Sequence, residues 1–364
     1  MKPALLGCLF ALHLWAAPAY IRTITIQASQ CGSASSSNFP VLVLLSGQQF
    51  KSAANGGHVH NSNGYDVLFW SNAAATSALT WEIDYYDPVG GNFWGWVLIP
   101  TVSNTVNTVF YVTYGDPTIT TFQSTATSVW TNAFDYVWHG GGGGTLTLTD
   151  STSNGNTATN SANPVTATTA QIAGGGAFVA ASSEALTIDS DPAALQPSSI
   201  TYSLWYNSSS DAGTAFRKNA GWRINSKTAS NNVQVIDSGG NTILAGYPVN
   251  IEDGNWHYIV VTFNALTSVT NALNLYVDNN AVVSANAMST GGIKYSSGAS
   301  AIGSGAFAGS FFNGSLDEAR VATGARAASW ITTEYNNQSN PTSFAQPGNE
   351  MVAHGLLLVL GMGN

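Results

Sequence analysis

The sequence predicts an all-β protein made of two β-sandwich (jelly-roll) domains. Short runs rich in Val, Ile, Thr, Tyr and Trp recur along the chain, and turn residues separate them. Only 8% of the residues are charged, whereas 44% are hydrophobic and 11% are aromatic, which suits an all-β extracellular protein. The 364 residues are enough for two domains of ordinary size.

Residues 1–19 have the pattern of an export signal. Lys2 supplies a positive start, residues 5–15 form an apolar run, and a small-x-small cleavage sequence follows. We therefore expect the mature chain to begin near Tyr20 and to be secreted, either into the extracellular space or to the cell surface.

Charge and cysteine content exclude several classes of partner and stabilisation. The formal net charge is −9 and no run of basic residues occurs, so nucleic acid is not an expected partner. The apolar run at the N-terminus is too short for a membrane span. Once the signal is removed, Cys31 is the only cysteine, which leaves no intrachain disulfide.

The first sandwich is expected over residues 20–122. No helical period interrupts its short apolar runs, and their regular spacing favours a sandwich. The expected strands are residues 21–26, 39–45, 65–70, 79–86, 93–99 and 108–114.

Five stretches of this first domain occur in an order typical of one bacterial secreted module. They are "NFPVLVLLSG", "GGHVHNSNGYDVLFW", "ALTWEIDYYDP", "FWGWVLIP" and "NTVFYVTYGDP". Together they resemble domain of unknown function 2341 over nearly the whole first domain. The resemblance implies homology but assigns no function.

Residues 123–148 are expected to link the first domain to the second. Gly140 to Gly144 are five consecutive glycines, which cannot hold one conformation unaided, so we interpret this segment as a hinge. An apolar tail, residues 346–364, is too short to span a bilayer. A truncated anchor, a sorting signal and a strand that docks on a partner all remain open for it.

The second sandwich is expected over residues 149–345. A helix is predicted near residues 325–336, because Ala327, Trp330, Ile331 and Tyr335 would share one face. The clearest strands are expected at residues 199–206, 256–263, 273–277 and 314–322.

Four stretches of the second domain carry a further resemblance: "ITYSLWYNSSS", "EDGNWHYIVVTFN", "LNLYVDNN" and "FNGSLDEARVATGARAASWITTEYNN". This domain resembles the laminin-G-like branch of the concanavalin A-like lectin/glucanase superfamily. The resemblance implies a curved sandwich with a concave face, on which lectins of this fold often bind glycans. Proteins that carry the first module very often carry this one directly after it.

The stretch "TWEIDYYDP" looks like the catalytic strand of laminarinase-type glucanases. On an extended strand, Glu82 and Asp84 point the same way, about 7 Å apart, a spacing that does not exclude an inverting glycosidase. The stretch nevertheless lies in the first module and not in the glucanase-like domain. We therefore predict no catalytic residues. We interpret it as a strand whose carboxylates face solvent while Trp81, Ile83 and Tyr85 pack inward.

A structural calcium ion is the metal that the sequence favours. "DSTSNGN", residues 150–156, is an oxygen-rich loop that resembles one at this place in laminin-G-like modules. The resemblance implies a Ca²⁺ ion on the convex side of the sandwich, for which Asp150, Asn154 and Asp317 are the expected ligands. The alternative is a set of Asx-turns with a buried structural Asp317.

Histidines are not expected to bind metal. His58 and His60 would share one strand face, but no third ligand is readable nearby, so a surface turn is the preferred interpretation. His139 and His257 adjoin apolar strand residues and are expected to pack structurally.

The sequence thus predicts an exported, non-catalytic binding protein. Its lectin-like domain is expected to recognise carbohydrate, such as an extracellular glycan, or a surface protein, as in adhesion. The alternative is a self-assembling structural subunit of a surface layer, filament or fibre. A glycoside hydrolase ranks third.

Overall fold

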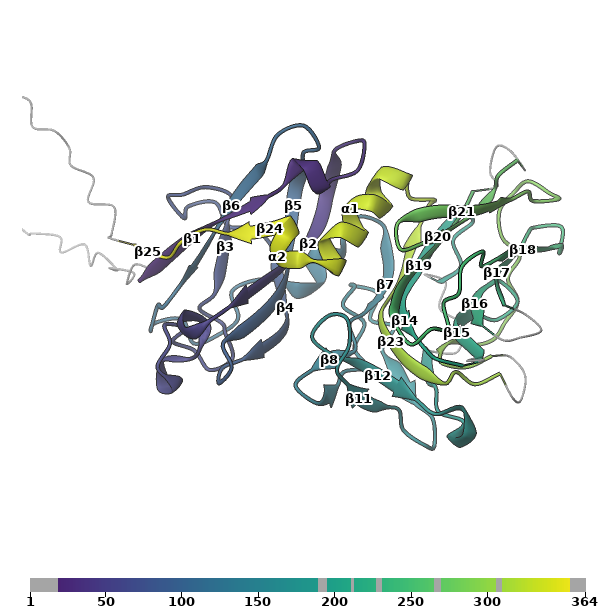
Figure 1. Ribbon diagram of the computed structural model, residues 1–364, viewed down its shortest axis with the longest axis horizontal. Coiled ribbons are helices and arrows are strands. Elements are labelled where there is room, and N and C mark those ends of the chain that lie inside the picture. Colours follow the sequence, from purple (N-terminus) through teal and green to yellow (C-terminus); the bar gives the residue numbers. More distant parts are fainter. Residues whose placement is uncertain are drawn as a thin grey trace, which may run out of the picture.

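The computed structural model describes residues 19–188, 195–210, 213–226, 231–264, 270–305 and 310–353. They form two antiparallel β-sandwiches that lie side by side (Figure 1), which confirms the predicted fold class. The expected export signal, apart from Ala19, and the end of the tail lie outside the described residues. Among the described residues, no helix has the length and apolar character needed to cross a bilayer.

The first sandwich has two sheets. One follows the order β24-β1-β6-β3, with β25 also on β1, and the other follows β2-β5-β4. All six expected strands of this domain are present. The bounds are β1 (Tyr20–Ile26), β2 (Ser36–Ser46), β3 (Leu68–Trp70), β4 (Trp81–Asp87), β5 (Asn92–Val102), β6 (Thr108–Tyr114), β24 (Ala345–Pro347) and β25 (Met351–Val352).

The C-terminal segment returns to the first sandwich. β24 pairs with β1 in the register Ile24 to Pro347, and β25 continues along the same strand. The helices α1 (Ala328–Ser339) and α2 (Pro341–Phe344) contact β2, and Phe344 is fully buried in the first core. The expected domain boundary near residue 345 is therefore misplaced, because the chain that follows the second sandwich completes the first (Figure 1).

The segment expected to be a hinge is structured. β7 (Phe134–Trp138) pairs with β23 (Gly314–Thr323), and the glycine run folds into the hairpin of β8 (Gly141–Gly142) and β9 (Thr145–Leu146). A Cβ atom built on Gly142 would lie 2.5 Å from Cγ of Tyr85, so only glycine lets the hairpin approach the first sandwich this closely. The expectation of a free hinge was wrong at these residues, because packing against Tyr85 fixes them.

The second sandwich also has two sheets. A seven-stranded sheet has the order β10-β13-β22-β15-β16-β17-β18, and an eight-stranded sheet has β11-β12-β23-β14-β19-β20-β21 with β7 added on β23. The bounds are β10 (Ala158–Asn160), β11 (Thr166–Thr168), β12 (Gly175–Phe178), β13 (Leu186–Ile188), β14 (Ile200–Asn207), β15 (Gly213–Lys218), β16 (Trp222–Ser226), β17 (Asn232–Ile236), β18 (Thr242–Gly246), β19 (Trp256–Phe263), β20 (Leu273–Val277), β21 (Asn280–Ala285) and β22 (Ser300–Ile302).

Packing between the sandwiches leaves one broad sheet face turned away from the contact. Val137 of β7 and Ala322 of β23 belong to the hydrophobic core of the first sandwich. Ile331 of α1 packs on Trp205 and Tyr258, on the outer face of the eight-stranded sheet. The seven-stranded sheet therefore lies on the side away from the first sandwich (Figure 1).

Candidate functional site

A row of side chains crosses the outer face of the seven-stranded sheet. On β16, Arg223 lies between Trp222 and Ile224, which both point into the core, so Arg223 must point outward. The cross-strand register extends this outward row to Arg217 on β15 and to Gln234 on β17. Strand alternation thus gathers two guanidinium groups and an amide on one face.

The two arginines have no acidic partner within the described part of the chain. Arg217 donates through Nε to the Ser304 carbonyl oxygen at 2.7 Å, whereas Nε of Arg223 is buried with no hydrogen-bond partner. Burial lowers the pKa of both groups, and for Arg217 the neighbouring Arg223 lowers the pKa further. Two adjacent positive charges without a counterion favour an anion beside them.

A small pocket opens at this row. It holds about 230 Å³ and combines cationic and amide groups. Its lining residues are Arg217, Lys218, Asn219, Ala220, Gly221, Trp222, Arg223, Gln234 and Ile236. Such a mixture suits a polar ligand with one negatively charged group.

A second cluster lies between the two sandwiches, where β4 meets the second domain. The pairing of β4 with β5 shifts register between Ile83 and Tyr85, which is a β-bulge at Asp84. Because of this extra residue, Tyr86 is buried in the core while Tyr85 packs on the glycine hairpin. The predicted inward position of Tyr85 was therefore wrong.

The carboxylates of Glu82 and Asp84 face the second sandwich and not open solvent, which corrects the second part of that prediction. Glu82 accepts hydrogen bonds from Trp130 Nε1 at 2.6 Å and from Ser151 Oγ at 2.7 Å. Asp84 Oδ2 accepts one from Trp96 Nε1 at 3.3 Å, while Oδ1 is buried and has no partner. Burial raises the pKa of Asp84 to about 8.

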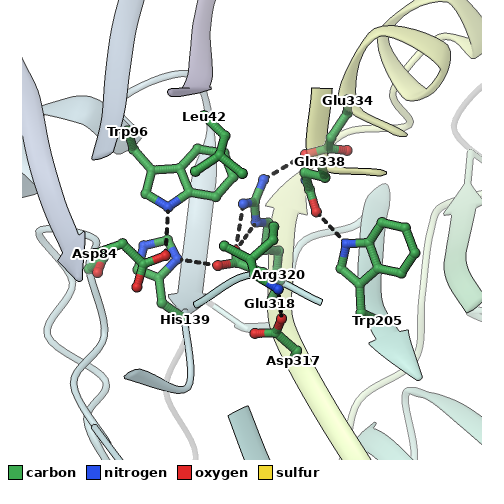
Figure 2. Close-up of polar contacts among 12 residues, drawn as sticks. Leu42, Asp84, Trp96, His139, Trp205, Asp317, Glu318, Arg320, Glu334 and Gln338 are labelled. Atoms are coloured by element: carbon green, nitrogen blue, oxygen red, sulfur yellow. Dashed lines mark hydrogen bonds and ion pairs between the residues drawn. The ribbon is translucent and has the colours of Figure 1, made fainter. Parts of the chain in front are cut away.

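His139 stands at the centre of this cluster (Figure 2). It follows β7, its side chain is 6% exposed, and its ring lies against Trp96 and Trp130. Nδ1 lies 2.8 Å from Glu318 Oε1, whereas Nε2 has no hydrogen-bond partner and is 3.6 Å from Glu82 Oε2. Burial lowers the pKa of His139, but the Glu318 and Asp84 carboxylates outweigh it and raise the pKa well above its usual value.

Glu318 is held in an unusual backbone conformation. Its φ angle is 52° although it is fully buried, and it lies where β23 shifts register against β14. A non-glycine residue with positive φ costs of order 1–3 kcal/mol. Arg320 Nη2 donates to Glu318 Oε2 at 2.6 Å, and Nη1 donates to Glu334 of α1 at 2.9 Å (Figure 2). The bulge thus aims Glu318 at His139 and Arg320.

A cleft of about 510 Å³ runs along β4 beside this cluster. Carboxylates and aromatic rings line it together. Its lining residues are Ser62, Asn63, Tyr65, Glu82, Ile83, Asp84, Tyr85, Tyr86, Phe122 and Ala126. The strand that the sequence interpretation treated as structural therefore borders one of the molecule's cavities.

The three residues expected to bind calcium have other contacts. The Asp150 carboxylate accepts hydrogen bonds from the backbone N–H groups of Val137, Thr152 and Asn156. The Asn154 amide donates to the Asp135 carbonyl oxygen. This pattern is the Asx-turn arrangement that was the alternative.

Asp317 contacts a residue outside that loop. Its Oδ2 accepts from the Ile172 backbone N–H at 2.8 Å, and its Oδ1 is buried without a partner. Among the described residues, no hydrogen bond joins it to Asp150 or Asn154. Calcium at these residues stays a prediction, and an unfolding midpoint unchanged by a chelator would count against it.

The other three histidines in the described part of the chain, His58, His60 and His257, occupy turns and hairpin ends. His58 stacks on Tyr20 and lies 3.0 Å from Glu350, next to the C-terminal strands. The His60 backbone N–H donates to Asp66. His257 bridges two carboxylates, with Nδ1 2.7 Å from Asp278 and Nε2 3.1 Å from Asp253.

Sequence reasoning missed two groups of residues. One is the row of Arg217, Arg223 and Gln234 (the arginine row). The other is the cluster of Glu82, Asp84, His139 and Glu318 between the sandwiches (the interface cluster). The row could have been found from "AFRKNAGWRIN", where an arginine follows an apolar aromatic residue on each side of a turn. The cluster had no comparable signal, because His139 and Glu318 are 179 residues apart and meet only through β7–β23 pairing.

Part of the chain matches a known protein family. Residues 174–332 match the family described as the concanavalin A-like lectin/glucanases superfamily, which confirms that resemblance over this range. No curated protein matched the sequence. The likeness of the first module to domain of unknown function 2341 stays a prediction.

Similar solved structures include two toxin binding domains and one domain of an arabinanase. The binding domain of Paraclostridial Mosquitocidal Protein 1 is 15% identical, with a TM-score of 0.45, over 56% of this chain and 52% of that chain. The botulinum neurotoxin serotype D binding domain is 13% identical, with a TM-score of 0.43, over 57% and 52%.

The third is domain 4 of AbnA, a GH43 extracellular arabinanase from Geobacillus stearothermophilus, in complex with arabinotriose. It is 18% identical, with a TM-score of 0.38, over 55% of this chain and 96% of that chain. This chain spans about half the length of the two toxin domains. At these TM-scores the likenesses carry no functional argument.

Proposed function

We propose that this protein is a non-catalytic carbohydrate-binding protein, and that its lectin-like sandwich binds acidic glycans on the outer face of the seven-stranded sheet. The observation that carries the proposal is the cross-strand pair Arg217 and Arg223, which lacks a described acidic partner and borders a pocket. The signal-like residues 1–19 support a role outside the cell.

The chemistry of the pocket favours a carboxylate or sulfate on a sugar. A guanidinium presents several N–H donors in a plane, which matches the paired oxygens of these anions. Gln234 and Asn219 line the same pocket and can hydrogen-bond sugar hydroxyls.

The overall charge of the chain is opposite in sign to the charge of the arginine pair. The chain has only 10 Lys and Arg residues against 19 Asp and Glu, so its average field repels anions. Two adjacent arginines on one sheet face oppose that field locally. We therefore expect recognition of the acidic group at short range and not by long-range steering.

A glycan array tests the proposal with residues 20–364 as the probe. The array carries uronic acid, sulfated and sialylated oligosaccharides, each beside a neutral counterpart of the same backbone. Binding to one or more acidic members with at least about tenfold preference over the neutral counterpart, about 1.4 kcal/mol, is the expected result. Equal binding of acidic and neutral members, or no binding across the array, would contradict it.

A further inference from the structure

The interface cluster contains donors that the binding function leaves unused. A ring nitrogen of His139 and the carboxylates of Asp84 and Glu318 all lie within 4.8 Å of one another. Imidazole and carboxylate groups are common protein ligands of divalent first-row metals. Three such groups on separate elements meet here in a largely buried space.

Two buried atoms of the cluster have no hydrogen-bond partner. They are His139 Nε2 and Asp84 Oδ1. Buried polar atoms are paired in the great majority of native structures, so two such atoms in one cluster need an explanation. The His139 side chain is more than nine-tenths buried, and its Nε2 is aimed at the Glu82 side of the cluster.

In this cluster His139 can bind a metal ion, and Glu318 holds the His139 ring in place. Glu318 already engages Nδ1 of His139, which leaves Nε2 as the free nitrogen donor. Metal-bound histidines almost always donate their other ring N–H to a carboxylate or carbonyl, which fixes the ring. Arg320 in turn holds Glu318, so this supporting arrangement is complete.

We propose that the cluster is a site for a divalent transition metal ion such as Zn²⁺ or Mn²⁺, held by His139 Nε2 with the carboxylates of Asp84 and Glu82. Glu82 Oε2 lies 3.6 Å from Nε2, close to the ~3.3 Å that separates two ligand atoms around a four-coordinate ion. The cleft along β4 is lined by Glu82 and Asp84 and therefore borders the site.

The charges of the cluster also suit a cation. Glu82, Asp84, Glu318 and Glu334 surround Arg320 and His139, so carboxylates outnumber the basic groups. A metal ion would replace the proton on Nε2, and binding would release protons. The rings of Trp96 and Trp130 pack against the His139 ring.

Isothermal titration of residues 20–364 with Zn²⁺ or Mn²⁺ tests this proposal, in two buffers of different ionisation enthalpy. The expected result is one equivalent bound with proton release. His139→Gln and Asp84→Asn should remove this binding, and Glu318→Gln should weaken it about 10–100-fold through the ring orientation. Circular dichroism checks the fold of each variant. If His139→Gln does not fold, the result for Asp84→Asn decides the test.

His257→Gln is the matched control, because His257 also lies between two carboxylates but uses both ring nitrogens. Asp150→Asn is a second control, because Asp150 belongs to the loop that is expected to bind calcium. Both controls should bind the metal like the unmodified chain. No binding by the unmodified chain, unchanged binding by Asp84→Asn, or loss in His257→Gln would each overturn the proposal.

Discussion

Arg217 of β15 and Arg223 of β16 are direct cross-strand partners, and both lie on the outer face of the seven-stranded sheet. Like charges directly opposite one another destabilise a sheet, by roughly 0.2–1 kcal/mol. A pair that works against stability in a chain with few basic residues is typical of a binding site.

Stability should therefore not depend on this pair. We expect Arg223→Gln to leave the free energy of unfolding unchanged or to raise it by up to about 1 kcal/mol, because a repulsive contact and a half-buried charge are removed. Urea denaturation measures this change. A loss of more than about 1 kcal/mol would show that Arg223 is structural and would count against the binding role.

Because the C-terminal chain returns to the first sandwich, a substitution far in sequence from residues 20–122 should lower the stability of the protein. Phe344→Ala should destabilise the protein by about 3–5 kcal/mol, because a fully buried ring is lost from the first core. Met351→Ala in β25 is the control, since Met351 is 52% exposed and should cost little. Equal effects of the two substitutions in chemical denaturation would argue against the C-terminal segment as part of that core.

The contact between the glycine hairpin and Tyr85 gives a matched test. Gly143 has φ +60°, and a Cβ there would lie 2.6 Å from Tyr85 Oη, whereas Gly144 has φ +80° with nothing within 4 Å. Gly144→Ala should cost only the backbone strain, about 1 kcal/mol. Gly143→Ala should cost clearly more in thermal or urea unfolding. Equal costs would mean that the hairpin does not pack on Tyr85.

His257 predicts a pH dependence of stability. The carboxylate of Asp278 raises the pKa of His257, with burial opposing this and Asp253 assisting it. The folded state therefore holds the proton more tightly than the unfolded state, whose pKa is about 6.5. This contribution is full below about pH 6.5 and is lost as the pH rises through the folded-state pKa.

The measurement is the free energy of unfolding of the unmodified chain and of His257→Gln from pH 5.5 to 8.5. Their difference should be largest at the acidic end and should shrink as the pH rises. His139 titrates in both proteins, so it cancels in the difference. A difference that stays constant across the range would contradict the ion pairs of His257.

Strand positions were predictable wherever side chains alternate strongly. The runs that became β6, β19 and β20 were located within one residue, because their apolar residues recur with the period of a half-buried or buried strand. β7 was missed because the glycine run that follows it reads as a linker, although "FDYVW" itself is rich in aromatic and β-branched residues.

Two features of the interface could not be read from the sequence. The bulge at Asp84 changes the face of every later residue of β4, yet "EIDYYD" contains no glycine or other local mark of a bulge. The pairing of β24 with β1 joins residues more than 300 positions apart, and their short runs carry no signal of their partner. Both features depend on tertiary packing, which decides register over local preference.

The most direct measurement for the binding proposal compares Arg223→Gln with Lys294→Gln, an exposed lysine of the same domain. The ligand is the best acidic oligosaccharide from the array, measured by titration at low and at physiological salt. The proposal predicts at least a tenfold loss of affinity for Arg223→Gln, about 1.4 kcal/mol, and none for Lys294→Gln. Unchanged affinity of Arg223→Gln, or equal losses in both variants, would contradict the claim that this arginine pair recognises the acidic group.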